Sequence, residues 1–140
     1  MFEKILVPVD FSPKNEAALT SAFELAARSE KSEIVLLHVI ETIDHLEFDE
    51  MAGFYHGLEA RAAAKLHQME ERWAGRGVRM RHDVVFGRRA ETVVRFAEEN
   101  VVDLIVLSSH QVDADHPALG WGTISYKIAI VARCPVLLVK

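Results

Sequence analysis

The chain has a single cysteine, few glycines and prolines, and no excess of basic side chains. Cys134 alone cannot form an intrachain disulfide, which fits a reducing compartment. Sixteen lysines and arginines stand against 21 aspartates and glutamates, and this formal charge of -5 argues against general nucleic-acid or membrane-surface binding. We find no apolar run long enough to span a bilayer and no signal-peptide pattern. The composition therefore predicts a cytoplasmic protein without disulfides.

The apolar residues form short runs that predict a layered α/β fold. Half of the 140 residues are hydrophobic, enough for one substantial core, so we expect a single domain over residues 1–140. Continuous apolar runs are typical of strands covered by helices on both faces, whereas alternation with charged residues is typical of a more exposed strand near an edge. The continuous runs are Ile5–Val9, Ile34–Ile40, Leu104–Leu107 and Val136–Val139, and the alternating run is Val78–Val84.

Segments with helical periodicity separate these strands. Ser12-Pro13 predicts a helix start with the serine as its cap. Strands that alternate with helices predict an α/β three-layer sandwich, with a mainly parallel five-stranded sheet and right-handed crossovers. The predicted apolar helix faces are Ala18, Ala22, Leu25 and Ala26; Leu58, Ala62, Leu66, Met69 and Trp73; Ala90, Val93, Val94, Ala97 and Val101; and Ile124, Ile128, Val131 and Ala132.

The last third of the chain contains the clearest candidate ligand site. After the strand Leu104–Leu107 comes a loop, and Gly122-Thr123 then begins a helix. This order places free backbone N–H groups and the positive end of a helix dipole where a phosphate can sit. An ordinary capped helix start is the alternative interpretation, because the loop carries Asp113 and Asp115 and lacks glycines that would let the backbone wrap a pyrophosphate.

Other motifs give little support for catalysis. The Walker pattern Gly-x-x-x-x-Gly-Lys-Ser/Thr and the nucleophile elbow Gly-x-Ser-x-Gly do not occur, so we assign no catalytic residue. His38 lies inside an apolar strand, where a hydrogen-bonded core histidine is the preferred interpretation. Cys134 is expected to be a small buried hydrophobe, because nothing near it in sequence suggests a lowered thiol pKa.

The loop beyond the fourth predicted strand holds several potential metal ligands. His110, Asp113, Asp115 and His116 have side chains that suit zinc, but their spacing fits no standard metal motif. A solvated polar loop is the preferred interpretation, and we assign no metal site. Trp121 has two open interpretations, stacking on a base or anchoring the loop by packing.

Taken in order, several motifs resemble those of the universal stress protein family. Lys4–Ser12 resembles the family's opening strand and turn, and Leu36–Val39 resembles its second strand. Further matches are Phe86-Gly87, Asp103–Leu107, Gly122–Ser125 and Arg133–Val139. The resemblance covers essentially the whole chain. It implies a Rossmann-like, adenine-nucleotide alpha hydrolase-like fold and a cytoplasmic homodimer that acts in stress response.

The resemblance also implies where a nucleotide would bind. Residues Pro8, Val9 and Asp10 would border adenine and ribose, and Val39 would line the base; Asp10 can equally cap the turn that follows it. The phosphate end would be formed by Ser108, Gly122, Thr123 and Ile124.

One branch of the family binds ATP or AMP and carries Gly-x-x-Gly after the fourth strand, followed by Gly-Ser or Gly-Thr. In this chain Ser108, or the nearby Gln111 and Ala114, stand at the first glycine pair, and Gly122-Thr123 matches the second. The first hypothesis is therefore a stress protein with a partly degenerate nucleotide site that acts through protein contacts. The alternatives are an ATP or AMP sensor that uses this loop, with Mg²⁺ near Asp10 or Asp113 when ATP is bound, and a weak ATPase or metal-dependent hydrolase.

The final strand is both apolar and terminal. An uncovered apolar edge is a risk for aggregation, and pairing with a second copy removes it. The expected homodimer interface consists of Val136, Leu137, Leu138 and Val139.

Overall fold

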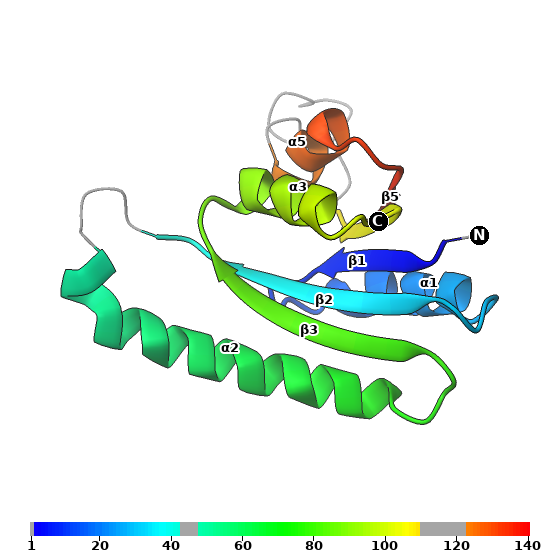
Figure 1. Cartoon of the computed structure of the whole chain (residues 1–140), viewed down its shortest axis with the longest axis horizontal. Helices are drawn as coiled ribbons and strands as arrows, with labels where there is room; N and C mark the ends of the chain where they lie inside the picture. Colours follow the sequence, from blue (N-terminus) through cyan, green and yellow to red (C-terminus); the bar gives the residue numbers. More distant parts are fainter. Residues whose placement is uncertain (1, 43–47, 110–122) are drawn as a thin grey trace.

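The computed structural model describes residues 2–42, 48–109 and 123–140, and it shows one parallel sheet between two layers of helices (Figure 1). The strand order is β3-β2-β1-β4-β5, and every neighbouring pair is parallel. The strands are β1 (Lys4–Pro8), β2 (Glu33–Ile40), β3 (Arg79–Phe86), β4 (Leu104–Ser108) and β5 (Val136–Val139). The predicted α/β three-layer architecture is therefore confirmed.

Two helices cover each face of the sheet, and each pair buries a separate hydrophobic core against it. The first face is covered by α1 (Asn15–Ala26) and α2 (Ala52–Trp73), which follows the short 3₁₀ helix η1 (Phe48–Met51). The opposite face is covered by α3 (Arg89–Glu99) and α5 (Ile124–Val131). Because successive strand residues point to opposite faces, the apolar runs fill both layers of the core. Among the described residues, none of the helices combines the length and the hydropathy of a membrane span.

The positions of the strands follow from their sequence pattern. Residues Ile34–Leu37 in the middle of β2 are fully or almost fully buried, whereas β3 is half-buried along most of its length and lies at one edge. The prediction that the alternating run lies near an edge is confirmed. At the other edge, β5 includes Leu137, which is 38% exposed.

Two predicted helix faces extend too far. Val101 is 80% exposed and Val131 is 62% exposed, so both assignments to the core are wrong. Since α3 ends at Glu99, the chain at Val101 has left the helix and adopts a φ of 54°, which turns that side chain outward. Phe96 and Val102 are buried instead.

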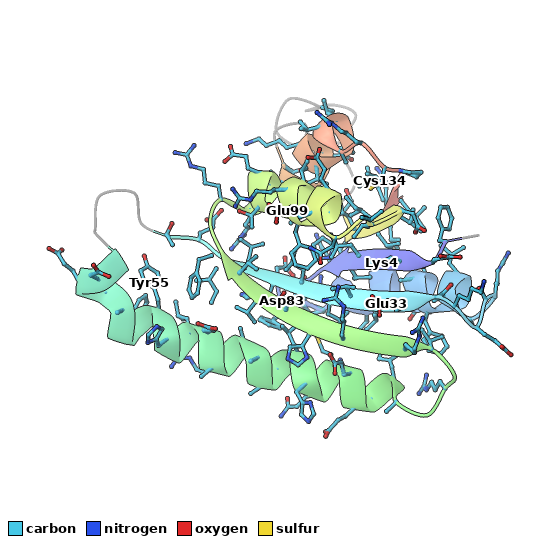
Figure 2. All side chains as sticks on the ribbon, viewed as in Figure 1. Lys4, Glu33, Tyr55, Asp83, Glu99 and Cys134 are labelled. Carbon is cyan, nitrogen blue, oxygen red and sulfur yellow. The ribbon has the colours of Figure 1, made fainter. Side chains whose placement is uncertain are left out.

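The start of two helices also differs from the prediction. Ser12 is not the cap of α1, because Lys14 holds that position and the helix begins at Asn15. The Ser12 carbonyl accepts a hydrogen bond from the Asn15 N–H at 3.1 Å, which forms a turn ahead of the helix. Helix α2 begins at Ala52, earlier than predicted, and Tyr55 lies in its first turns (Figure 2). Tyr55 is buried, and its ring centroid lies 5.9 Å from that of Phe86.

Gly87 connects β3 to α3 and generates a stability prediction. Its φ is +150°, a region that side-chain-bearing residues rarely adopt, and a Cβ there would overlap the Thr92 hydroxyl. We expect Gly87→Ala to lower the free energy of unfolding by about 1–3 kcal/mol. In contrast, Gly57→Ala inside α2 meets only an ordinary contact and should raise it by about 0.5–1 kcal/mol. Urea unfolding measures both, and a Gly87→Ala protein as stable as the unsubstituted chain would contradict the prediction.

Candidate functional site

The strand order reverses between β1 and β4, and these two strands pair over only a short stretch. Their paired positions are Ile5 with Leu104 and Leu6 with Ile105. On the other side of β1, pairing with β2 continues, and the Val9 N–H donates to the Leu37 carbonyl at 2.8 Å. A crevice at the carboxyl ends of strands beside such a switch point is the usual ligand position in open α/β sheets.

Pro8 explains why the ladder between β1 and β4 ends. The backbone groups of Glu3 and Val9 bond to the β2 side, and the Lys4 carbonyl accepts from Asp103 on the β4 side. Because backbone N–H and C=O groups alternate in direction along a strand, those of Leu6, Pro8 and then Asp10 point toward β4. The proline has no N–H to donate at the position where the next ladder bond would form.

A side chain spans the gap that this break leaves. Asn15, at the start of α1, is 4% exposed, and its Oδ1 accepts from the Asp10 N–H at 3.1 Å. Its Nδ2 donates to the Ser108 hydroxyl at 3.1 Å, and that hydroxyl donates to the Lys14 carbonyl at 3.1 Å. The carboxyl ends of β1 and β4 are thus joined through one buried amide.

Above this bridge lies a cavity of about 430 Å³. Its walls come from the ends of β1, β2 and β4 and from the first residues of α1, α3 and α5. The predicted site residues that line it are Pro8, Val9, Asp10, Val39, Ser108, Thr123 and Ile124. Gly122 lies outside the described residues, as do His110, Asp113, Asp115, His116 and Trp121. In the part of the chain that is described, no cluster of three potential metal ligands occurs.

The lining residues that were not predicted as site residues include Lys14, Asn15, His38 and Arg89. A sequence signal existed for Lys14, Asn15 and Arg89, because the first two follow the end of the first strand and Arg89 follows the end of the third. Residues just beyond the carboxyl ends of parallel strands gather at one edge of the sheet. His38 was predicted to be a hydrogen-bonded core histidine; its hydrogen bond is confirmed, but the residue is half-buried and lies at the cavity.

The cavity has charges of both signs. Burial alone raises the pKa of the Asp10 carboxyl, but hydrogen bonds from Ser12, from its own N–H and from Asn15 outweigh burial and hold that pKa below its ordinary value. The Ser12 N–H donates to Asp10 Oδ1 at 2.9 Å, so the predicted turn-capping role is confirmed. Lys14 and Arg89 are the described cations of the lining, and Arg89 Nε lies 3.8 Å from a Glu41 carboxylate oxygen.

Aromatic and cationic groups hold the turn after β1. Phe11 has a φ of 65°, unusual for a bulky residue, and its ring centroid lies 4.4 Å from that of His38. The Lys65 ammonium from α2 lies 5.0 Å from the Phe11 ring centroid, a cation–π arrangement. The His38 Nδ1–H donates to the Val9 carbonyl at 2.8 Å, which fixes the ring beside the end of β1.

Cys134 lies in the segment that leads into β5 (Figure 2). It is not among the residues that line the cavity. It is partly buried against the core between the sheet and the α3 layer. Burial raises the pKa of its thiol, which disfavours the reactive thiolate. The prediction of a hydrophobic, unreactive role agrees with this environment, although the side chain is not fully buried.

The parallel sheet and the cavity at its switch point define a Rossmann-like α/β protein of the adenine-nucleotide alpha hydrolase-like type. A sequence model of the Universal stress protein family matches residues 1–140, and the chain belongs to this family. The family resemblance of the sequence motifs is thereby confirmed.

Three relatives illustrate the similarity. The chain is 29% identical over 150 residues to Universal stress protein YxiE of Bacillus subtilis, with 100% of both proteins covered. It is 27% identical over 159 residues to Universal stress protein MJ0577 of Methanocaldococcus jannaschii, covering 100% of this chain and 96% of that protein. The solved structure of MJ0577 matches with a TM-score of 0.84 at 28% identity, over 100% and 96% of the two chains.

The third relative, from Archaeoglobus fulgidus, was solved in complex with dAMP. It matches with a TM-score of 0.64 at 19% identity, over 99% and 98% of the two chains. At this level of identity, the match shows a shared fold.

The environment of His38 generates a pH prediction. Burial lowers its pKa from the ordinary 6.5; the nearby Arg89 and Lys65 charges act the same way, and they outweigh the opposing effects of the Val9 carbonyl and Asp10. Just below the ordinary pKa, the unfolded chain therefore binds more protons at this site than the folded chain, so stability rises with pH there and is lost on acidification.

We expect His38→Gln to reduce this pH dependence. Urea unfolding about one unit above and one unit below the ordinary histidine pKa would measure the difference for each protein. The same loss of stability on acidification in both proteins would contradict the prediction.

Proposed function

We propose that this protein is an adenine-nucleotide-binding universal stress protein whose bound state is read by other proteins in the cytoplasm. The observation that carries the proposal is the cavity beside Asp10 at the switch point between β1 and β4. The dAMP complex of the Archaeoglobus fulgidus relative supports the choice of ligand class. The proposed output is protein contact, because phosphoryl transfer needs a positioned nucleophile and charge neutralisation, and the sequence lacks the Walker lysine that would supply part of that neutralisation.

The chemistry of the lining suits a nucleoside. Leu37, Val39, Val93 and Ile128 present apolar surface on which a flat base can pack. The ionised Asp10 carboxylate is an acceptor for ribose hydroxyls, and such charge-assisted hydrogen bonds are stronger than neutral ones.

The phosphate end has a partly degenerate character in this proposal. The Ser108 hydroxyl is already engaged with the Lys14 carbonyl and Asn15, so it is not an uncommitted donor for a phosphate. Thr123 lies at the cap of α5, where backbone N–H groups and the helix dipole favour an anion.

The described cations and Asp10 also bear on the choice of phosphate. Lys14 and Arg89 against Asp10 leave one net positive charge in the described lining, with His38 neutral. This balance favours AMP over ATP, and Mg²⁺ would be needed only to accompany ATP.

We further propose a homodimer that forms through β5. This strand lies at an edge of the described sheet, and the part of the chain around it exposes Leu137 at 38%, with Ile130 at 81% and Val131 at 62% on α5. Pairing with the same strand of a second copy would satisfy the open backbone groups of the edge and cover Leu137.

Asp10 provides the test of nucleotide binding. Calorimetry with AMP should give saturable binding, and Asp10→Asn, which keeps the side-chain shape but removes the charge, should weaken it about tenfold or more. Glu24→Gln, at an exposed carboxylate on the outer side of α1, is the control and should bind normally. Absence of heat and of thermal stabilisation with AMP, ADP and ATP would contradict the proposed function.

Leu137 provides the test of the dimer. Leu137→Glu places a charge on the proposed interface and should convert a dimer into monomers or insoluble protein, as measured by light scattering. Val101→Glu adds the same charge at a residue that is 80% exposed beyond α3, and it should leave the dimer intact. A Leu137→Glu protein with an unchanged dimer mass would refute this interface, as would an unsubstituted protein that is monomeric.

A further inference from the structure

We propose that Asn15 is a positioning residue for the nucleotide, which acts by fixing the separation of Asp10 and Ser108 at the mouth of the cavity. This inference rests on the proposed function. It assigns a role to a buried amide that needs no contact of its own with the ligand.

Asn15 is 4% exposed and lines the cavity, and a buried amide is costly unless its polar atoms have partners. Its Oδ1 and Nδ2 atoms both have partners, and these lie at the carboxyl ends of different strands. Asp10 follows β1, and Ser108 ends β4. A residue needed only to begin α1 would not require bonds to two strands.

The Asn15 bridge takes the place of backbone pairing between β1 and β4. Beyond Leu6, the backbone ladder between β1 and β4 has ended, because Pro8 cannot donate the next bond. Just beyond β1, the Asp10 N–H is the next donor that points toward β4, and Asn15 Oδ1 accepts it. The width of the crevice at this level is therefore set by the length of one asparagine side chain rather than by direct strand pairing.

The bridge also orders the groups that a ligand would meet. The Asp10 carboxylate is held by the Ser12 N–H, its backbone N–H is held by Asn15, and Ser108 is tied to the Lys14 carbonyl. The bridge thus places the carboxylate, which would bind the ribose, and the start of α1 in one fixed arrangement with the end of β4. Removing the Asn15 amide would let Asp10 and Ser108 move relative to each other. At a given contact area, the affinity for a ligand depends largely on how well the binding groups are positioned in advance.

An amide is the side chain that this position requires. It accepts one hydrogen bond and donates another at the same time. Aspartate has nearly the same shape but offers only acceptors when ionised, and leucine has a similar size and offers neither. The two substitutions therefore separate the loss of the donor from the loss of the whole bridge.

The experiment measures AMP binding by calorimetry to the full chain and to Asn15→Leu, Asn15→Asp and Ser32→Ala. Ser32 is a matched control, because it is 2% exposed and its hydroxyl donates to the Phe2 carbonyl at the opposite end of the sheet. All three substitutions should lower the melting temperature. We expect Asn15→Leu and Asn15→Asp to weaken AMP binding about tenfold or more, and Ser32→Ala to bind like the unsubstituted chain, well below every melting temperature.

The pH dependence of the Asn15→Asp protein adds a readout that lost stability alone would not give. When the new carboxyl is protonated at acidic pH, it regains a donor, so its affinity relative to the unsubstituted chain should recover. Asn15→Asp also serves if Asn15→Leu fails to fold. Normal AMP affinity in Asn15→Asp at neutral pH, or an equal loss in Ser32→Ala, would overturn the role of Asn15 alone. An unsubstituted chain that binds no adenine nucleotide would overturn the proposed function and this inference with it.

Discussion

The central constraint of this structure is the short pairing between β1 and β4. Two register pairs join the strands, and the crevice opens directly beyond them. At the amino end, Asp103 holds the seam closed, because its two carboxylate oxygens accept from the Glu3 and Lys4 N–H groups at 2.8 and 3.2 Å. At the carboxyl end, Asn15 takes over. The same seam must therefore be tight enough to keep the sheet whole and open enough to form a cavity.

The layers of the sheet position the other walls of the cavity. Residues of β2 alternate between the two cores, so Leu37 and Val39 face the α3 and α5 layer while His38 faces the other side. The first residues of α1, α3 and α5 meet at the same edge, since each helix follows a strand whose carboxyl end lies there. The topology therefore brings apolar surface from the strands and polar groups from the helix starts together at one cavity.

Much of the fold was predictable, because continuous apolar runs such as Ile34–Ile40 leave little alternative to a strand buried on both faces. The family resemblance placed Asp10 and Val39 correctly at one cavity. Periodicity failed at Val101, since a spacing rule does not show where a helix ends. Asn15 was missed for another reason: its importance depends on two strands that are separated by most of the chain, and no local pattern encodes their distance.

The Phe11 turn described above has a consequence for binding thermodynamics. Backbone held in a sparsely populated conformation persists only where surrounding contacts over-determine it, and here the His38 ring, the Lys65 ammonium and the Asp10–Ser12 bond do so. The conformational entropy of this segment is therefore lost when the chain folds. A ligand that arrives at Asp10 meets an already ordered wall, and its association carries a smaller entropic penalty on that side than it would against a pliable turn.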